Sequence, residues 1–176
     1  MSYKLSIAVY GPGAIPEEPS HWAFVFHTTT SGPENTPPTT TASASTSTST
    51  STTTTPRRKT GNVLHIIHPD NNKNFYTFDK HEDHEFESNA CKGYFTIATL
   101  TPEQAQRADK IIADEPVPKV GEENCQDWVL NATISLLMEQ LVDEEACQRV
   151  DGVRGKSALE VAEVLGESWV RPAPRE

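Results

Sequence analysis

Cys125 is the residue whose neighbours best suit it to act as a nucleophile. Asn124 is a good N-cap residue, because its side-chain oxygen accepts from the free amides of a first helical turn. Cys125 would then be the first helical residue, where the positive end of the helix dipole favours a thiolate. Burial of a small side chain is the commoner role for a lone cysteine. The helix itself is indicated by apolar residues at three- and four-residue spacing: Val129, Ala132, Thr133, Leu136, Leu137 and Leu141.

Two histidines are candidates to work with Cys125. A thiol has only a small thiolate fraction at neutral pH, so a nucleophilic cysteine needs a base nearby. His21 lies where a loop meets an apolar segment, and a histidine on a sheet facing a helix start meets that need. His65 is the candidate third member, which would fix the tautomer and orientation of His21. Spacing alone does not establish the triple, because six histidines and three cysteines offer many such combinations.

The segments around these three residues resemble a known family. In order, they are similar to the motifs of the lecithin:retinol acyltransferase-like group of the NlpC/P60 superfamily: His21-Trp22-Ala23-Phe24-Val25, Gly61-Asn62-Val63-Leu64-His65-Ile66 and Asn124-Cys125-Gln126-Asp127-Trp128-Val129. The order histidine, histidine, cysteine is that of a circularly permuted papain-like arrangement. The resemblance implies that Cys125 forms an acyl-enzyme thioester, that His21 activates it, and that His65 orients His21.

Two features depart from the family pattern. A Ser/Thr-rich insertion separates the two histidine segments, where the family usually has a short turn. Gln126-Asp127-Trp128 follows the cysteine, in place of the more usual Glu-His-Phe type. The composition also resembles that of small fungal proteins of unknown function.

The elements that must position these residues are a run of strands followed by a run of helices. Alternating or β-branched segments predict strands at residues 4–10, 21–27, 62–68, 75–78 and 93–99. Helical patterns with good N-cap residues predict helices at about 102–113, from 125 onward, near 144–149 and at 158–165. This order indicates an α+β fold, with an antiparallel sheet of about five strands packed on helices. The resemblance narrows the fold to the permuted papain-like type.

The chain divides into one domain and two less ordered segments. Residues 1–27 and 61–170 are predicted to form a single permuted papain-like domain. Residues 28–60 are predicted to be a disordered Ser/Thr/Pro-rich insertion, since from 39 to 55 every residue is Ser or Thr except Ala42 and Ala44. Such a stretch has no apolar surface to offset its ordering entropy. Residues 171–176 are predicted to be a loose tail, since they contain two prolines, Pro172 and Pro174.

Composition excludes several classes of partner. The net charge of −10 argues against nucleic-acid binding, which needs a basic surface, and against docking on anionic membranes. Three cysteines without close pairing do not suggest a disulfide framework, and no apolar run has the length of a signal peptide core or a membrane span. We therefore expect a cytoplasmic protein with no integral membrane segment.

The remaining histidines and cysteines are assigned to other roles. His81-Glu82-Asp83-His84-Glu85 could bind a divalent metal if helical, but a solvated acidic turn is the favoured interpretation. His27 and His68 end strands and are expected at the surface, and Cys91 and Cys147 are expected to be structural. We expect no bound metal and no cofactor.

These observations predict a cysteine-dependent acyl transferase or hydrolase. Cys125, His21 and His65 would act on an ester, amide or isopeptide bond of a small-molecule, lipid or peptide acyl substrate. The alternatives are a catalytically inactive binding or accessory protein of the same fold, and a tailoring factor in a fungal specialised-metabolite pathway.

Overall fold

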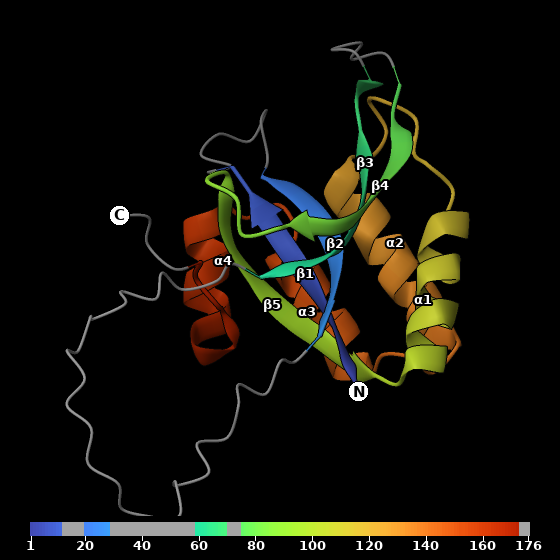
Figure 1. Cartoon of the computed structure of the whole chain (residues 1–176). Helices are drawn as coiled ribbons and strands as arrows, with labels where there is room; N and C mark the ends of the chain where they lie inside the picture. Colours follow the sequence, from blue (N-terminus) through green and yellow to red (C-terminus); the bar gives the residue numbers. More distant parts are fainter. Residues whose placement is uncertain (12–19, 29–58, 70–74, 173–176) are drawn as a thin grey trace, which may run out of the picture.

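The computed structural model describes residues 1–11, 20–28, 59–69 and 75–172. The insertion predicted at 28–60 falls almost wholly outside these residues, as do most of the loop before His21 and most of the turn after residue 69. Within the described part, the chain forms five strands and four α-helices (Figure 1). The predicted α+β class is confirmed.

The sheet is antiparallel throughout and has the order β4-β3-β2-β1-β5. The alternating and β-branched segments identified in the sequence supply its strands. Their bounds are β1 Tyr3–Tyr10, β2 His21–Thr28, β3 Thr60–Ile67, β4 Thr77–Glu85 and β5 Cys91–Leu100. The order places β2, which begins at His21, at the centre of the sheet and β4 at one edge.

The fourth strand differs from the prediction. A strand was expected at 75–78, with the acidic and histidine-rich residues after it forming a turn, whereas β4 runs through those residues to Glu85. Charged side chains have low strand propensity, but that preference depends on position within the sheet. As an edge strand, β4 pairs only with β3 and leaves most of its side chains half-buried or exposed, so charged residues are tolerated there.

The helices follow their predicted caps. They are α1 Pro102–Asp114, α2 Cys125–Met138, α3 Glu144–Val153 and α4 Ala158–Leu165. Thr101, Asn124 and Ser157 each cap a helix through a reciprocal capping box. Leu141 was expected on the face of α2, but the helix ends at Met138 and the chain turns at Gln140, which has φ 59°. Leu141 reaches the core from beyond this turn.

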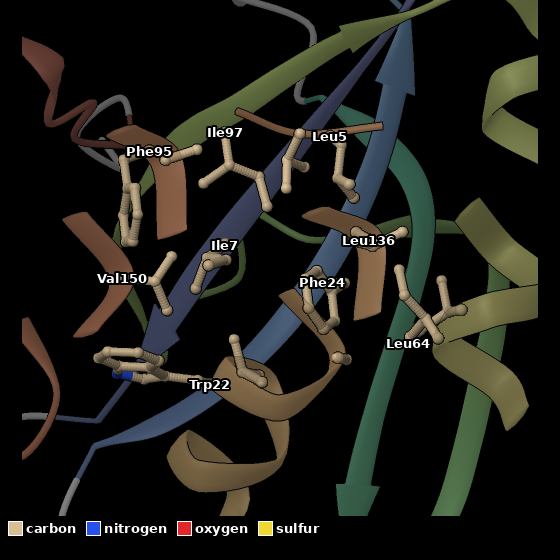
Figure 2. Close-up of a cluster of buried hydrophobic side chains, with 14 of the residues drawn as sticks. Leu5, Ile7, Trp22, Phe24, Leu64, Phe95, Ile97, Leu136 and Val150 are labelled. Carbon is tan, nitrogen blue, oxygen red and sulfur yellow. The ribbon is translucent and has the colours of Figure 1, made fainter. Parts of the chain in front are cut away.

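The helices pack against one face of the sheet (Figure 1). Figure 2 shows the core between them, with Ile7, Phe24 and Phe95 of the sheet near Leu136 and Val150 of the helices. Because side chains alternate along a strand, the other residues of β1 and β2 point to the opposite face. A second, smaller cluster covers that face: Ala8, Ala23, Val25, Val63, Phe86 and Tyr94.

The C-terminal end of the predicted domain is held by β5. Val170, the last residue of that domain, exchanges two backbone hydrogen bonds with Tyr94, of 2.9 and 3.0 Å. The Trp169 ring packs over Gly93, where an added Cβ would lie 2.2 Å from ring carbons. A glycine in β5 therefore makes room for the tryptophan that anchors the chain end.

Candidate functional site

Cys125 is the first residue of α2, as the sequence predicted. Asn124 Oδ1 accepts from the backbone N–H of Gln126 at 2.8 Å, and Asp127 Oδ2 accepts from the N–H of Asn124 at 2.9 Å. Asp127 also accepts from Arg154 Nη1 at 2.7 Å. These bonds satisfy the free amides of the first turn and fix where the helix begins.

Gln126 joins the start of α2 to the residue that precedes β2. Its side-chain amide is almost completely buried; it donates from Nε2 to the carbonyl of Ser20 at 2.9 Å. Its Oε1 accepts from the backbone N–H of Gly155 at 2.7 Å, in the turn between α3 and α4. The amide thus uses a donor and an acceptor at once, and it sets the position of Cys125 relative to His21.

The Cys125 thiol is buried, with 7% of the residue exposed, and belongs to the helix-side core. Burial raises its pKa and outweighs the backbone N–H groups of Trp22, Cys125 and Gln126, which lower it. The helix start therefore does not produce the thiolate that its dipole alone would favour. At neutral pH the group is a thiol.

His21 and His65 are brought together as predicted. His21 Nε2 lies 2.9 Å from His65 Nδ1, and the two rings are tilted at 60° to each other. On its other side, His65 Nε2 lies 3.5 Å from Asp79 Oδ2. Burial, followed by the neighbouring His65, lowers the pKa of His21 to about 4; burial also lowers the pKa of His65, against the opposing effect of Asp79. Both imidazoles are neutral at pH 7.

Cys125 and His21 approach the start of β2 from different faces of the sheet. Trp22 and Phe24 point toward the helices, so His21 points to the opposite face, where it pairs across the strands with Tyr10 at a ring distance of 6.2 Å. On the helix side, the backbone N–H of Trp22 lowers the pKa of the Cys125 thiol. Among the described residues, no hydrogen bond joins the Cys125 thiol to the His21 ring.

Asp79 is a residue of this region that the sequence did not point to, and His81 was considered only together with residues 82–85. Asp79 is paired directly with His65 across β3 and β4, and His81 follows two residues later on the same face. His81 Nε2 lies 2.9 Å from Asp79 Oδ2. The missing signal was the register between β3 and β4, which pairs His65 with Asp79.

Two further predictions about histidines are resolved here. The segment 81–85 is neither a helix nor a turn but part of β4. His27 was expected at the surface and is buried, since β2 is a central strand and Phe86 and Tyr94 cover its end with ring distances of 5.2 and 5.8 Å. His27 Nε2 is 3.1 Å from Ser6 Oγ. His68 is half-buried and stacks on Tyr76.

The other two cysteines lie away from this region. Cys91 is buried on β5 with Sγ 3.6 Å from the carbonyl of Gly93, and burial raises its pKa to about 11. Cys147 is half-buried on α3, and burial likewise raises its pKa. Neither has a histidine among its hydrogen-bond partners in the described part of the chain.

Comparisons with protein-family models, with curated proteins and with solved structures found no match for this chain. Of the helices in the described ranges, none combines the length and apolar character needed to cross a membrane. The function is therefore argued from the chemistry of the residues alone.

Proposed function

We propose that this chain is a cysteine-dependent acyl transferase or hydrolase of the permuted papain-like type. Cys125 Sγ attacks the carbonyl carbon of an ester, amide or isopeptide bond while His21 takes the thiol proton. Backbone N–H groups at the start of α2 stabilise the negative oxygen. His21 returns the proton to the leaving alcohol or amine, and water or a second acceptor then opens the thioester.

The observation that carries this proposal is the row of His21, His65 and Asp79 at the start of β2. His21 Nε2 lies 2.9 Å from His65 Nδ1, and His65 Nε2 lies 3.5 Å from Asp79 Oδ2. With the Asp79 carboxylate facing His65 Nε2, the proton of a neutral His65 is favoured on Nε2. His65 Nδ1 then accepts from His21 Nε2–H. This leaves the lone pair of His21 Nδ1 free to accept the thiol proton, as a general base requires.

The proposal requires a change in the direction of the His21 side chain. His21 is the first residue of β2, and the backbone N–H of the next residue, Trp22, is among the groups that lower the pKa of the thiol. Rotation of the His21 side chain around the end of the strand would bring Nδ1 toward Sγ, and it would break the hydrogen bond to His65 that the resting state has. Substrate binding at the strand end would supply the energy for this rotation.

The resting arrangement of Cys125 and His21 favours a second function, that of a binding or accessory protein of the same fold. The thiol is buried with a raised pKa, and the histidine lies on the other face of the sheet. Such a protein needs no reactive thiol. The two functions therefore differ in whether the reactivity of Cys125 depends on His21.

Labelling with an electrophilic thiol probe distinguishes them. The full chain is reacted at pH 7 in the presence of a chelator, and peptide mapping separates Cys125 from the half-buried Cys147. For an enzyme, His21→Ala slows labelling of Cys125 by roughly 10²-fold, the usual contribution of a general base. His84→Ala, which alters an exposed histidine of β4, leaves the rate unchanged. Equal rates in wild type and His21→Ala contradict the enzymatic proposal and support the accessory role.

A further inference from the structure

We propose that His65, Asp79 and His81 form a binding site for a zinc-type divalent cation on the face of the sheet opposite the helices. This inference goes beyond the proposed function and does not depend on it. Each residue offers one ligand atom, and these atoms lie within 4.8 Å of one another. Two imidazoles and one carboxylate are a donor set that suits zinc and related transition metals, and leave one position for water.

The positions of the three residues follow from strand pairing. His65 on β3 is directly opposite Asp79 on β4, and His81 is its diagonal neighbour on the same face. Opposite and diagonal pairs are the cross-strand positions whose side chains can meet. The three ligands therefore rest on two paired strands, which hold a site more firmly than a loop does.

The distances are close to those of a tetrahedral centre. Metal bonds of about 2.0–2.1 Å place two tetrahedral ligand atoms roughly 3.3 Å apart. Asp79 Oδ2 lies 3.5 Å from His65 Nε2 and 2.9 Å from His81 Nε2, on either side of that value. Small rotations of the His81 ring, which is half-exposed at the sheet edge, complete the geometry.

One of the proposed ligand atoms, His65 Nε2, has no hydrogen-bond partner in the described structure. His65 Nε2 is fully covered and has no well-formed hydrogen bond in the described structure, because Asp79 Oδ2 is too far and too poorly aligned. A buried polar atom left in this state costs free energy, which a metal bond would recover. The other nitrogen, Nδ1, lies 2.9 Å from His21 Nε2. Ligating histidines usually donate from their second nitrogen in this way, so His21 would be the acceptor that fixes His65.

A bulge in β4 gathers a further imidazole at the same place. The register with β3 shifts between Val63 and Gly61, so β4 gains one residue, and Asp83 adopts φ 49°. His84 consequently lies on the same side as His81, with the rings 5.3 Å apart. The bulge is held by Asn62 Oδ1, which accepts from the N–H of Asp83 at 3.2 Å. The strand edge thus concentrates nitrogen donors around the carboxylate.

The test is direct titration of Zn²⁺ into the chelator-treated full chain, followed by calorimetry. The chain carries Cys125→Ser, so thiol ligation at the proposed catalytic residue cannot contribute. We expect one ion per chain, and we expect Asp79→Asn and His81→Ala each to weaken binding by at least roughly tenfold. His68→Ala, which alters a histidine just beyond the end of β3 that stacks on Tyr76, is the matched control and leaves the affinity unchanged. Mg²⁺ does not compete, because it prefers oxygen ligands.

Absence of zinc binding overturns the proposal, as does equal affinity in Asp79→Asn, His81→Ala and the parent chain. Circular dichroism checks folding, and the nearly isosteric Asp79→Asn provides the test should His81→Ala unfold. The thiol-probe experiment contains a chelator and reads Cys125, so the two proposals can fail independently.

Discussion

Gln126 provides a sharp test of how the start of α2 is fixed to the sheet. We predict that Gln126→Leu, which keeps the size of the side chain, removes both of its hydrogen bonds. The carbonyl of Ser20 is left buried without a partner, which costs about 1–3 kcal/mol. The N–H of Gly155 belongs to an exposed residue and can turn to water, so its loss adds little. The free energy of unfolding should fall by roughly 1–3 kcal/mol.

Gln126→Glu separates the donor from the acceptor. One carboxylate oxygen still accepts from Gly155, but the other faces the Ser20 carbonyl, so two acceptors meet in a buried place. Protonation of the glutamate restores a donor, and the pKa of this residue is therefore raised in the folded state. The stability that the protonated glutamate contributes is fully present below the pKa that glutamate has in the unfolded chain. It is lost as pH rises through the raised pKa of the folded state.

Urea denaturation at neutral and at mildly acidic pH measures both effects, with wild type measured at each pH as the reference. Gln148→Leu is the matched control, since Gln148 is exposed on α3, and its change should stay within about 0.5 kcal/mol. A Gln126→Leu variant within that same margin would refute the reasoning. So would a Gln126→Glu variant whose deficit does not shrink on acidification.

Three further predictions concern other parts of the fold. Burial, with help from Lys59, lowers the pKa of His27 from 6.5 to about 4, so stability is complete above pH 6.5 and falls by up to roughly 3 kcal/mol as pH drops through this window. Urea titrations should show a flatter pH dependence for His27→Gln, which does not titrate. Gly93→Ala should displace the Trp169 ring, and limited proteolysis should then cut the C-terminal segment faster than in wild type. Asp143→Ala removes the N-cap bond of α3 and should lower the unfolding free energy, again measured in urea, by about 1 kcal/mol.

Local signals were enough to predict most of the elements. Capping residues at Thr101, Asn124 and Ser157 each marked a helix start within a residue or so, because the chemistry of a free first turn is local. The central strands were visible for the same reason, since buried strands are rich in β-branched and aromatic residues. The edge strand β4 was not, because its charged residues are permitted only by its position in the sheet.

The candidate site was less predictable, because it depends on pairing between strands. The structure brings His21 and His65 within hydrogen-bond distance, and the roles assigned to them stay a prediction. Asp79, His81 and the burial of His27 follow from register and sheet order, which composition does not contain. The sequence also could not predict on which face of the sheet the His21 side chain lies. It depends on which residues of β2 meet the helices, and both Trp22 and Ala23 could have filled that role.

His65 connects the two proposals and makes them mutually exclusive in any one molecule. As a partner of a general base, His65 carries its proton on Nε2, toward Asp79, and accepts at Nδ1 from His21. As a metal ligand through Nε2, it carries the proton on Nδ1 and donates to His21 Nε2, which moves the His21 proton to Nδ1. No proton is gained or lost overall, but His21 can no longer accept one from Cys125. Metal binding at the β4 edge would therefore change the tautomers of His65 and His21, and in that state His21 could not serve as the base for the Cys125 thiol.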